Sequence, residues 1–105
     1  SRNIPAWLRR QVLHRDDHRC TFAGCDMRRF LQVHHIKPWP GPTNLDNLIT
    51  LCHFHHKLVH EYGWSVRLGA IPGTADWFRP DKTPYEPKPV AANRAPPQEK
   101  LPPVG

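Results

Sequence analysis

The chain has 105 residues, a net charge of +6 at neutral pH and a pI near 9.7. It is therefore long enough for one small domain, and its charge favours polyanionic partners such as nucleic acid. No apolar run approaches the roughly 18 residues that a membrane span needs, the N-terminus has no signal-peptide core, and three cysteines cannot pair completely. We therefore expect a cytoplasmic protein whose cysteines bind metal, unless the chain was cut from something longer.

The first predicted element is a short amphipathic helix in "PAWLRRQVLHRDD", residues 5–17. Its apolar residues recur at spacings of three to five, and its other face is basic. We expect the apolar stripe to consist of Trp7, Leu8, Val12 and Leu13.

Two strands and a second helix are predicted next. The run "RFLQVHHIKPW" is strand-like until Pro38 and Pro40 end it, and "NLITL" is a second run of the same kind, so the two predict a hairpin with a long loop. Residues 53–61 contain neither glycine nor proline, and Gly63 is a natural stop for a helix of about two turns.

A second hairpin is predicted from "GWSVRLGA" and "ADWFRP", with Trp64, Val66, Leu68 and Trp77 as its packing residues. From Pro80 onward the composition changes, because this part contains eight of the thirteen prolines. We expect that tail to be extended or disordered.

Four potential zinc ligands occur as two pairs that the first hairpin would bring together. Zinc prefers four tetrahedral thiolate and imidazole ligands, so a C-x₄-C pair and a C-x₂-H pair predict a structural Cys₃His site. The alternatives are buried free cysteines in a reducing cell, or His53 as the fourth ligand. The predicted ligands are Cys20, Cys25, Cys52 and His55.

Six of the eight histidines lie between residues 33 and 60. His56 and His60 are four apart on the predicted helix, so both imidazoles can reach one ion. His34 and His35 are neighbours on a strand and point to opposite faces. One of them can complete an open, catalytic type of metal site, which leaves the other as a general base. We expect His14 and His18, which lie outside this cluster, to be solvated.

The pattern "VHHI", an asparagine before the second strand and "HHKLVH" resembles the HNH endonucleases, a branch of the ββα-metal or His-Me finger nucleases. The resemblance implies that His34, His56 and His60 are ligands of a catalytic ion and that His35 is the general base. It also implies that an asparagine braces the loop. Asn44 competes for this role, but Asn47 directly precedes the second strand and lies nine residues before the helix ligand, as in the family.

The wider pattern, "RDDHRCTFAGC" with "HHIKPW" and "PTNLDNLITLCHFHHKLVHEYGW", resembles the zinc-containing HNH domain at the C-terminus of a large family of bacterial multidomain proteins. Many HNH proteins carry two C-x₂-C pairs. This chain departs from that pattern, because its first pair is C-x₄-C and His55 stands where the second pair has a cysteine. We therefore expect a small α+β fold with a ββα-metal core, a structural zinc site, an N-terminal helix and a C-terminal β-hairpin. We assign residues 1–89 to this domain and residues 90–105 to a proline-rich tail.

The implied activity is metal-dependent DNA cleavage, by nicking or through both strands, with low sequence specificity and with 5′-phosphate and 3′-hydroxyl products. The expected cofactors are a structural Zn²⁺ and one catalytic Mg²⁺, Mn²⁺, Ni²⁺ or Zn²⁺. We expect the domain to act as a homodimer or as part of a larger host protein. The rival hypothesis is a noncatalytic zinc-binding adaptor for DNA or protein. Five arginines flank the site in the sequence and either contact phosphates or form a solvated basic face: Arg9, Arg10, Arg15, Arg28 and Arg29.

Overall fold

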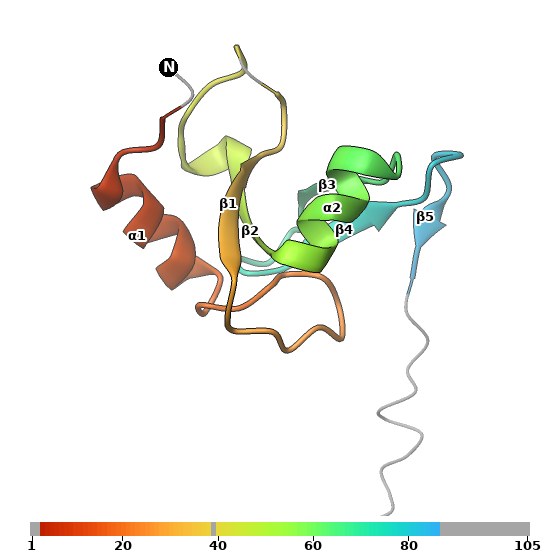
Figure 1. Cartoon of the computed structure of the whole chain (residues 1–105), viewed down its shortest axis with the longest axis horizontal. Coiled ribbons are helices and arrows are strands. Elements are labelled where there is room, and N and C mark those ends of the chain that lie inside the picture. Colours follow the sequence, from red (N-terminus) through yellow and green to blue (C-terminus); the bar gives the residue numbers. More distant parts are fainter. Residues whose placement is uncertain (1–2, 39, 87–105) are drawn as a thin grey trace, which may run out of the picture.

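The computed structural model describes residues 3–38 and 40–86. It contains two antiparallel sheets, one of two strands and one of three strands in the order β3-β4-β5, together with two α-helices and one 3₁₀-helix (Figure 1). The elements are α1 (Ala6–Arg15), β1 (Leu31–His35), η1 (Leu45–Asn47), β2 (Leu48–Cys52), α2 (His53–Glu61), β3 (Ser65–Leu68), β4 (Ala75–Phe78) and β5 (Pro84–Tyr85). The predicted small α+β fold with its ββα core is confirmed.

The β1–β2 hairpin lies between the two helices, with α1 on one side and α2 on the other (Figure 1). Its register runs from Leu31 opposite Cys52 to His35 opposite Leu48. All five residues of β2 are buried. Because both faces of this strand are covered, its sequence "LITLC" is apolar almost throughout and does not alternate with exposed polar residues.

Side chains on the two faces of the hairpin enter two separate cores. Leu48 packs with Leu8 and Val12 of α1. Ile49 and Leu51 face the opposite way, because successive side chains of a strand alternate, and pack in the larger core. That core also contains Cys20, Cys52, Val66 and Trp77. Strand β2, which ends at Cys52, therefore lies between two packed layers.

Helix α2 begins and ends where the sequence predicted. Gly63 follows it with a φ of +80°, a left-handed conformation that glycine adopts without strain. The backbone then turns so that the N–H groups of Tyr62 and Trp64 both donate to the carbonyl of Leu58. This turn directs β3 back onto the core.

Three expectations need correction. Trp7 is 57% exposed, because Leu8 and Val12, four residues apart, define the buried face of α1 and Trp7 lies to one side of it. The first strand is shorter than the predicted run and ends at His35, three residues before Pro38. Strand β5 pairs with β4 inside the segment from Pro80 onward, which was expected to be extended or disordered, so the first part of that segment belongs to a sheet.

Residues 90–105, predicted to be an extended or disordered tail, lie outside the described residues. Within the described part of the chain, no helix is both long and apolar enough to cross a membrane.

Candidate active site and metal centre

A compact set of metal-ligand atoms lies at the junction of β2, α2 and the loop after α1. The sulfur atoms of Cys20, Cys25 and Cys52 and a ring nitrogen of His55 all lie within 4.8 Å of one another. Nδ1 of His55 is 3.4 Å from Sγ of Cys20 and 3.3 Å from Sγ of Cys52. Sulfur and nitrogen ligands of a tetrahedral zinc ion are separated by about 3.5 Å, so the observed distances fit this ion.

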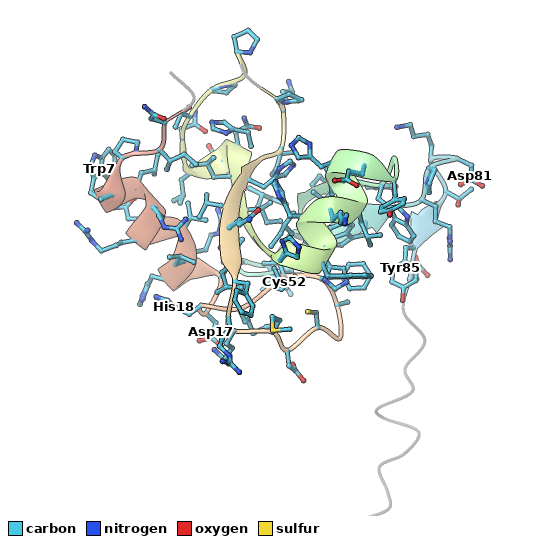
Figure 2. All side chains as sticks on the ribbon, in the orientation of Figure 1. Trp7, Asp17, His18, Cys52, Asp81 and Tyr85 are labelled. Atoms are coloured by element: carbon cyan, nitrogen blue, oxygen red, sulfur yellow. The ribbon has the colours of Figure 1, made fainter. Side chains whose placement is uncertain are left out.

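Local structure positions each of these ligands. Cys52 ends β2 and is the N-cap of α2, where its Sγ accepts the backbone N–H of His55 at 3.5 Å. The N–H of Cys25 donates to the carbonyl of Phe22 through a turn at Gly24, whose φ is +88°. The ring of Phe22 also stacks on His55, with centroids 4.0 Å apart, a contact that the sequence did not predict. Figure 2 labels Cys52 beside the start of α2.

Burial shifts the pKa values of two members of this cluster, Cys20 and His55. It raises the pKa of the Cys20 thiol to about 12 and lowers the pKa of His55. A buried thiolate therefore needs a bound cation, whereas the neutral imidazole is ready to act as a ligand. His53, the alternative ligand, is exposed and lines a different surface pocket with Phe30. This Cys₃His cluster is consistent with the structural zinc site of HNH domains.

A second group of histidines lines an open pocket of about 480 Å³ between β1 and α2. His34 faces His56 with ring centroids 5.1 Å apart, and the His56 and His60 centroids are 5.0 Å apart. His35 also lines this pocket. The remaining lining residues are Val33, Ile36, Pro38 and Val59, so no carboxylate of the described residues takes part.

Two of the pocket histidines, His34 and His56, have lowered pKa values, which favours their neutral form. Burial, followed by the charges of His56, His60 and His35, lowers the pKa of His34 to about 4. Burial and the neighbouring His60 and His53 lower the pKa of His56. Neutral imidazoles keep a lone pair for a metal ion. Among the described residues, however, only the Cys₃His set has three or more ligand atoms packed within 4.8 Å, so the histidine pocket is the looser arrangement.

His35 and Asn47 occupy opposite ends of the loop that joins β1 to β2. Nε2 of His35 lies 2.9 Å from Oγ1 of Thr43, a side-chain partner for which the sequence gave no signal. Buried Asn47 accepts the N–H of Lys37 at Oδ1 and donates through Nδ2 to the carbonyls of Lys37 and Pro42. Asn44 is exposed and contributes a backbone carbonyl, which accepts the N–H of Asn47.

The arginines expected to contact phosphates have different environments. Arg15 forms an internal ion pair with Asp16 and donates to two backbone carbonyls. Its guanidinium is therefore not available for the expected phosphate contact. Arg28 donates to the carbonyl and the carboxylate of Asp17. Both are internal contacts that spacing along the chain does not reveal. Arg28 stays exposed despite this contact, as do Arg9, Arg10 and Arg29.

The hairpin, the following helix and the Cys₃His cluster define a zinc-type ββα domain. The family model for HNH endonucleases matches residues 18–61, which include β1, β2, α2 and all eight residues discussed above as ligands or base. This part of the chain belongs to the HNH endonuclease family.

Similar sequences occur in two uncharacterized proteins of Mycobacterium tuberculosis strain H37Rv. One is 34% identical over 74 residues, which is 68% of this chain and 16% of that protein. The other is 40% identical over 73 residues, 66% of this chain and 14% of that protein. The chain thus spans about a sixth of the length of these relatives. No solved structure matches it.

Proposed function

We propose that this domain is a metal-dependent endonuclease that hydrolyses DNA phosphodiester bonds with low sequence specificity. The observation that supports the proposal is one pocket lined by four histidines. His34 and His35 come from β1, with His35 in contact with the loop residue Thr43, and His56 and His60 come from α2. The family match and the positive charge of the chain favour DNA as the substrate.

The catalytic ion would be held by His34, His56 and His60. These side chains fit such a role because they line one pocket and because burial lowers the pKa of two of them. A donor set without carboxylates favours Mn²⁺, Ni²⁺ or Zn²⁺ by affinity, while Mg²⁺ is the more abundant ion. When bound, the ion supplies positive charge that stabilises the developing negative charge on the phosphate and on the departing oxygen.

His35 would act as the general base. If its Nε2 carries the proton and donates to Oγ1 of Thr43, Nδ1 is left with the lone pair that takes a proton from water. The water oxygen bonds to phosphorus as the bond from phosphorus to the 3′-oxygen breaks. The 3′-oxygen takes a proton from solvent, so the products carry a 5′-phosphate and a 3′-hydroxyl.

Asn47 would act indirectly, through the loop contacts described above. It bonds to Lys37 and Pro42, which lie close in sequence to His35 and Thr43. The exposed arginines Arg9, Arg10 and Arg29 would contact phosphates, which position DNA but do not read its sequence.

The test is cleavage of supercoiled plasmid by the zinc-loaded protein in metal-free buffer, with Mg²⁺, Mn²⁺, Ni²⁺ or Zn²⁺ added in turn. His35→Ala is compared with His14→Ala, which removes an exposed histidine of α1 outside the pocket. We expect the first variant to lose about 10²-fold or more in rate, as is typical when a general base is removed, and the second to cleave as the wild type does.

The same experiment separates the nuclease from the adaptor. Zinc content and the thermal unfolding midpoint should be equal in the wild type and both variants. DNA binding without cleavage in any of the four metals would favour the noncatalytic adaptor.

A further inference from the structure

We propose that Arg15 is a positioning residue for the catalytic loop, because it fixes η1 and thereby Asn47. The catalytic consequence rests on the proposed nuclease function. The structural consequence, ordering of the loop next to His35, does not. Sequence spacing had suggested a phosphate contact for this arginine, and its contacts point to a different role.

The guanidinium of Arg15 is itself held in place by a buried carboxylate. Its Nε donates to Oδ1 of Asp16 at 2.8 Å and its Nη2 donates to Oδ2 at 3.0 Å. Asp16 is 1% exposed and also accepts the backbone N–H of Thr50 in β2 at 3.0 Å. This two-point ion pair fixes the orientation of the guanidinium plane at the end of α1.

Two nitrogens of the same guanidinium donate to backbone carbonyls at the first residue of η1 and at the residue that follows η1. Nη1 donates to the carbonyl of Leu45 at 2.8 Å, and Nη2 donates to the carbonyl of Leu48 at 2.7 Å. These carbonyls lie two residues before and one residue after Asn47. One rigid side chain thus sets both backbone attachment points of the segment that carries the asparagine.

Asn47 in turn holds both ends of the loop around the proposed base. Its carbonyl accepts the N–H of Ile36 at 2.9 Å, and its Oδ1 accepts the N–H of Lys37 at 2.9 Å. Its Nδ2 donates to the carbonyls of Lys37 at 3.2 Å and Pro42 at 2.8 Å. Ile36 follows His35 directly, and Pro42 precedes Thr43, whose hydroxyl contacts the His35 ring.

The chemistry of this arrangement requires arginine. One guanidinium donates four hydrogen bonds in fixed directions, whereas a lysine ammonium has only three donors and no planar fork. Arg15→Lys would keep the charge beside Asp16 but release at least one carbonyl of η1. Loop order and charge can therefore be separated by a conservative substitution.

The first measurement is amide hydrogen exchange in the zinc-loaded wild type, Arg15→Lys and Val66→Ala. Val66 is buried in the other core, so the control lowers the stability of the fold without touching η1. We expect Arg15→Lys to speed exchange at Ile36 and Lys37 by about tenfold more than at Ile49 and Leu51, as loss of about one hydrogen bond implies. An even increase at all four amides would mean that Arg15 only stabilises the fold, and would overturn the proposal.

The second measurement is a kinetic double-mutant cycle of Arg15→Lys with Asn47→Ala on plasmid DNA. If Arg15 acts through Asn47, the double variant should be no slower than Asn47→Ala alone, with kcat lowered and KM unchanged. Additive losses, or an equal loss of kcat in Val66→Ala, would also overturn it. A wild type that does not cleave DNA would refute the nuclease and leave the exchange result to decide the loop.

Discussion

Helix α2 supplies neighbouring residues to two sites of different construction. His55 belongs to the Cys₃His cluster, whose ligand atoms lie within 4.8 Å of one another, and His56 belongs to an open pocket of about 480 Å³. Successive residues of a helix differ by about 100° in direction, so neighbours can face different surroundings. The difference teaches that a closed ligand set ties segments of a small fold together, whereas a looser set leaves room for a substrate.

The largest effect is expected from His55→Ala. This change removes one of the four proposed zinc ligands and the ring that stacks on Phe22, and it would leave Cys20 and Cys52 buried without a full coordination shell. Structural zinc contributes on the order of 10 kcal/mol in small domains, which is comparable to the whole stability of a domain of this size. We expect loss of bound zinc and of cooperative thermal unfolding, measured by elemental analysis and circular dichroism.

Two variants calibrate this result. His55→Cys should retain one zinc ion, because it restores four ligands. His53→Ala should behave as the wild type does, since His53 is exposed and lies outside the cluster. A folded, zinc-free His55→Ala protein would show that the cluster is a group of free cysteines.

A large effect on activity with little effect on the fold is expected from His56→Ala, one residue further on. It removes one proposed ligand of the catalytic ion but leaves the Cys₃His cluster complete. We expect cleavage to fall by about 10²-fold at limiting metal, with zinc content unchanged and the thermal midpoint within a few degrees of the wild type. If both neighbours gave the same loss of fold, the distinction between the two sites would be wrong.

The contrast between the sites also explains what the sequence could predict. The pair Cys20 and Cys25, the pair Cys52 and His55, and the helix at 53–61 each depend on local spacing, so they could be predicted directly from the sequence. The choice between His53 and His55 depends on where the start of α2 points. Strand β5 could not be predicted, because its two residues, Pro84 and Tyr85, carry no periodic signal and gain their order by pairing with β4.

Contacts between distant segments were the least accessible to sequence reasoning. Arg15 was considered a phosphate contact because it is basic and flanks the site in the sequence, yet its partners at Leu45 and Leu48 are 30 and 33 residues away. The contact of Thr43 could not be predicted either, because no periodicity links a loop hydroxyl to His35. Such side chains acquire their roles only when the hairpin has folded.

A smaller effect on the free energy of unfolding is expected when pH is changed before a catalytic metal ion is added to the histidine pocket. Burial lowers the pKa of His34 from 6.5 to about 4, so the folded state keeps this ring neutral in a range where the unfolded chain protonates it. The unfolded state then binds more protons, and the free energy of unfolding should decrease as pH falls from 6.5 toward 4, with no further contribution from this group below that range.

The measurement compares urea unfolding of the zinc-loaded wild type and His34→Gln at pH 7 and pH 5.5. Other groups contribute to both proteins, so the difference between them isolates His34. The wild type should lose more stability on acidification than the variant does. A His34 ring that titrates near 6.5 by NMR would contradict the assigned burial.

The smallest effect is expected from Thr43→Val, which keeps the shape of the side chain and removes the hydroxyl 2.9 Å from Nε2 of His35. A neutral hydrogen bond contributes about 1 kcal/mol, so the loss should lower kcat by roughly five-fold and leave zinc and plasmid binding unchanged. Thr74→Val is the matched control, because Thr74 donates its hydroxyl to Ile71 in the β3–β4 turn. In the proposed sites, different contacts would orient the histidines: zinc coordination and stacking on Phe22 for His55, and a loop hydroxyl for His35. If Thr43→Val and Thr74→Val had the same kcat, the loop hydroxyl would not orient the base, and the backbone contacts of Asn47 would have to do so alone.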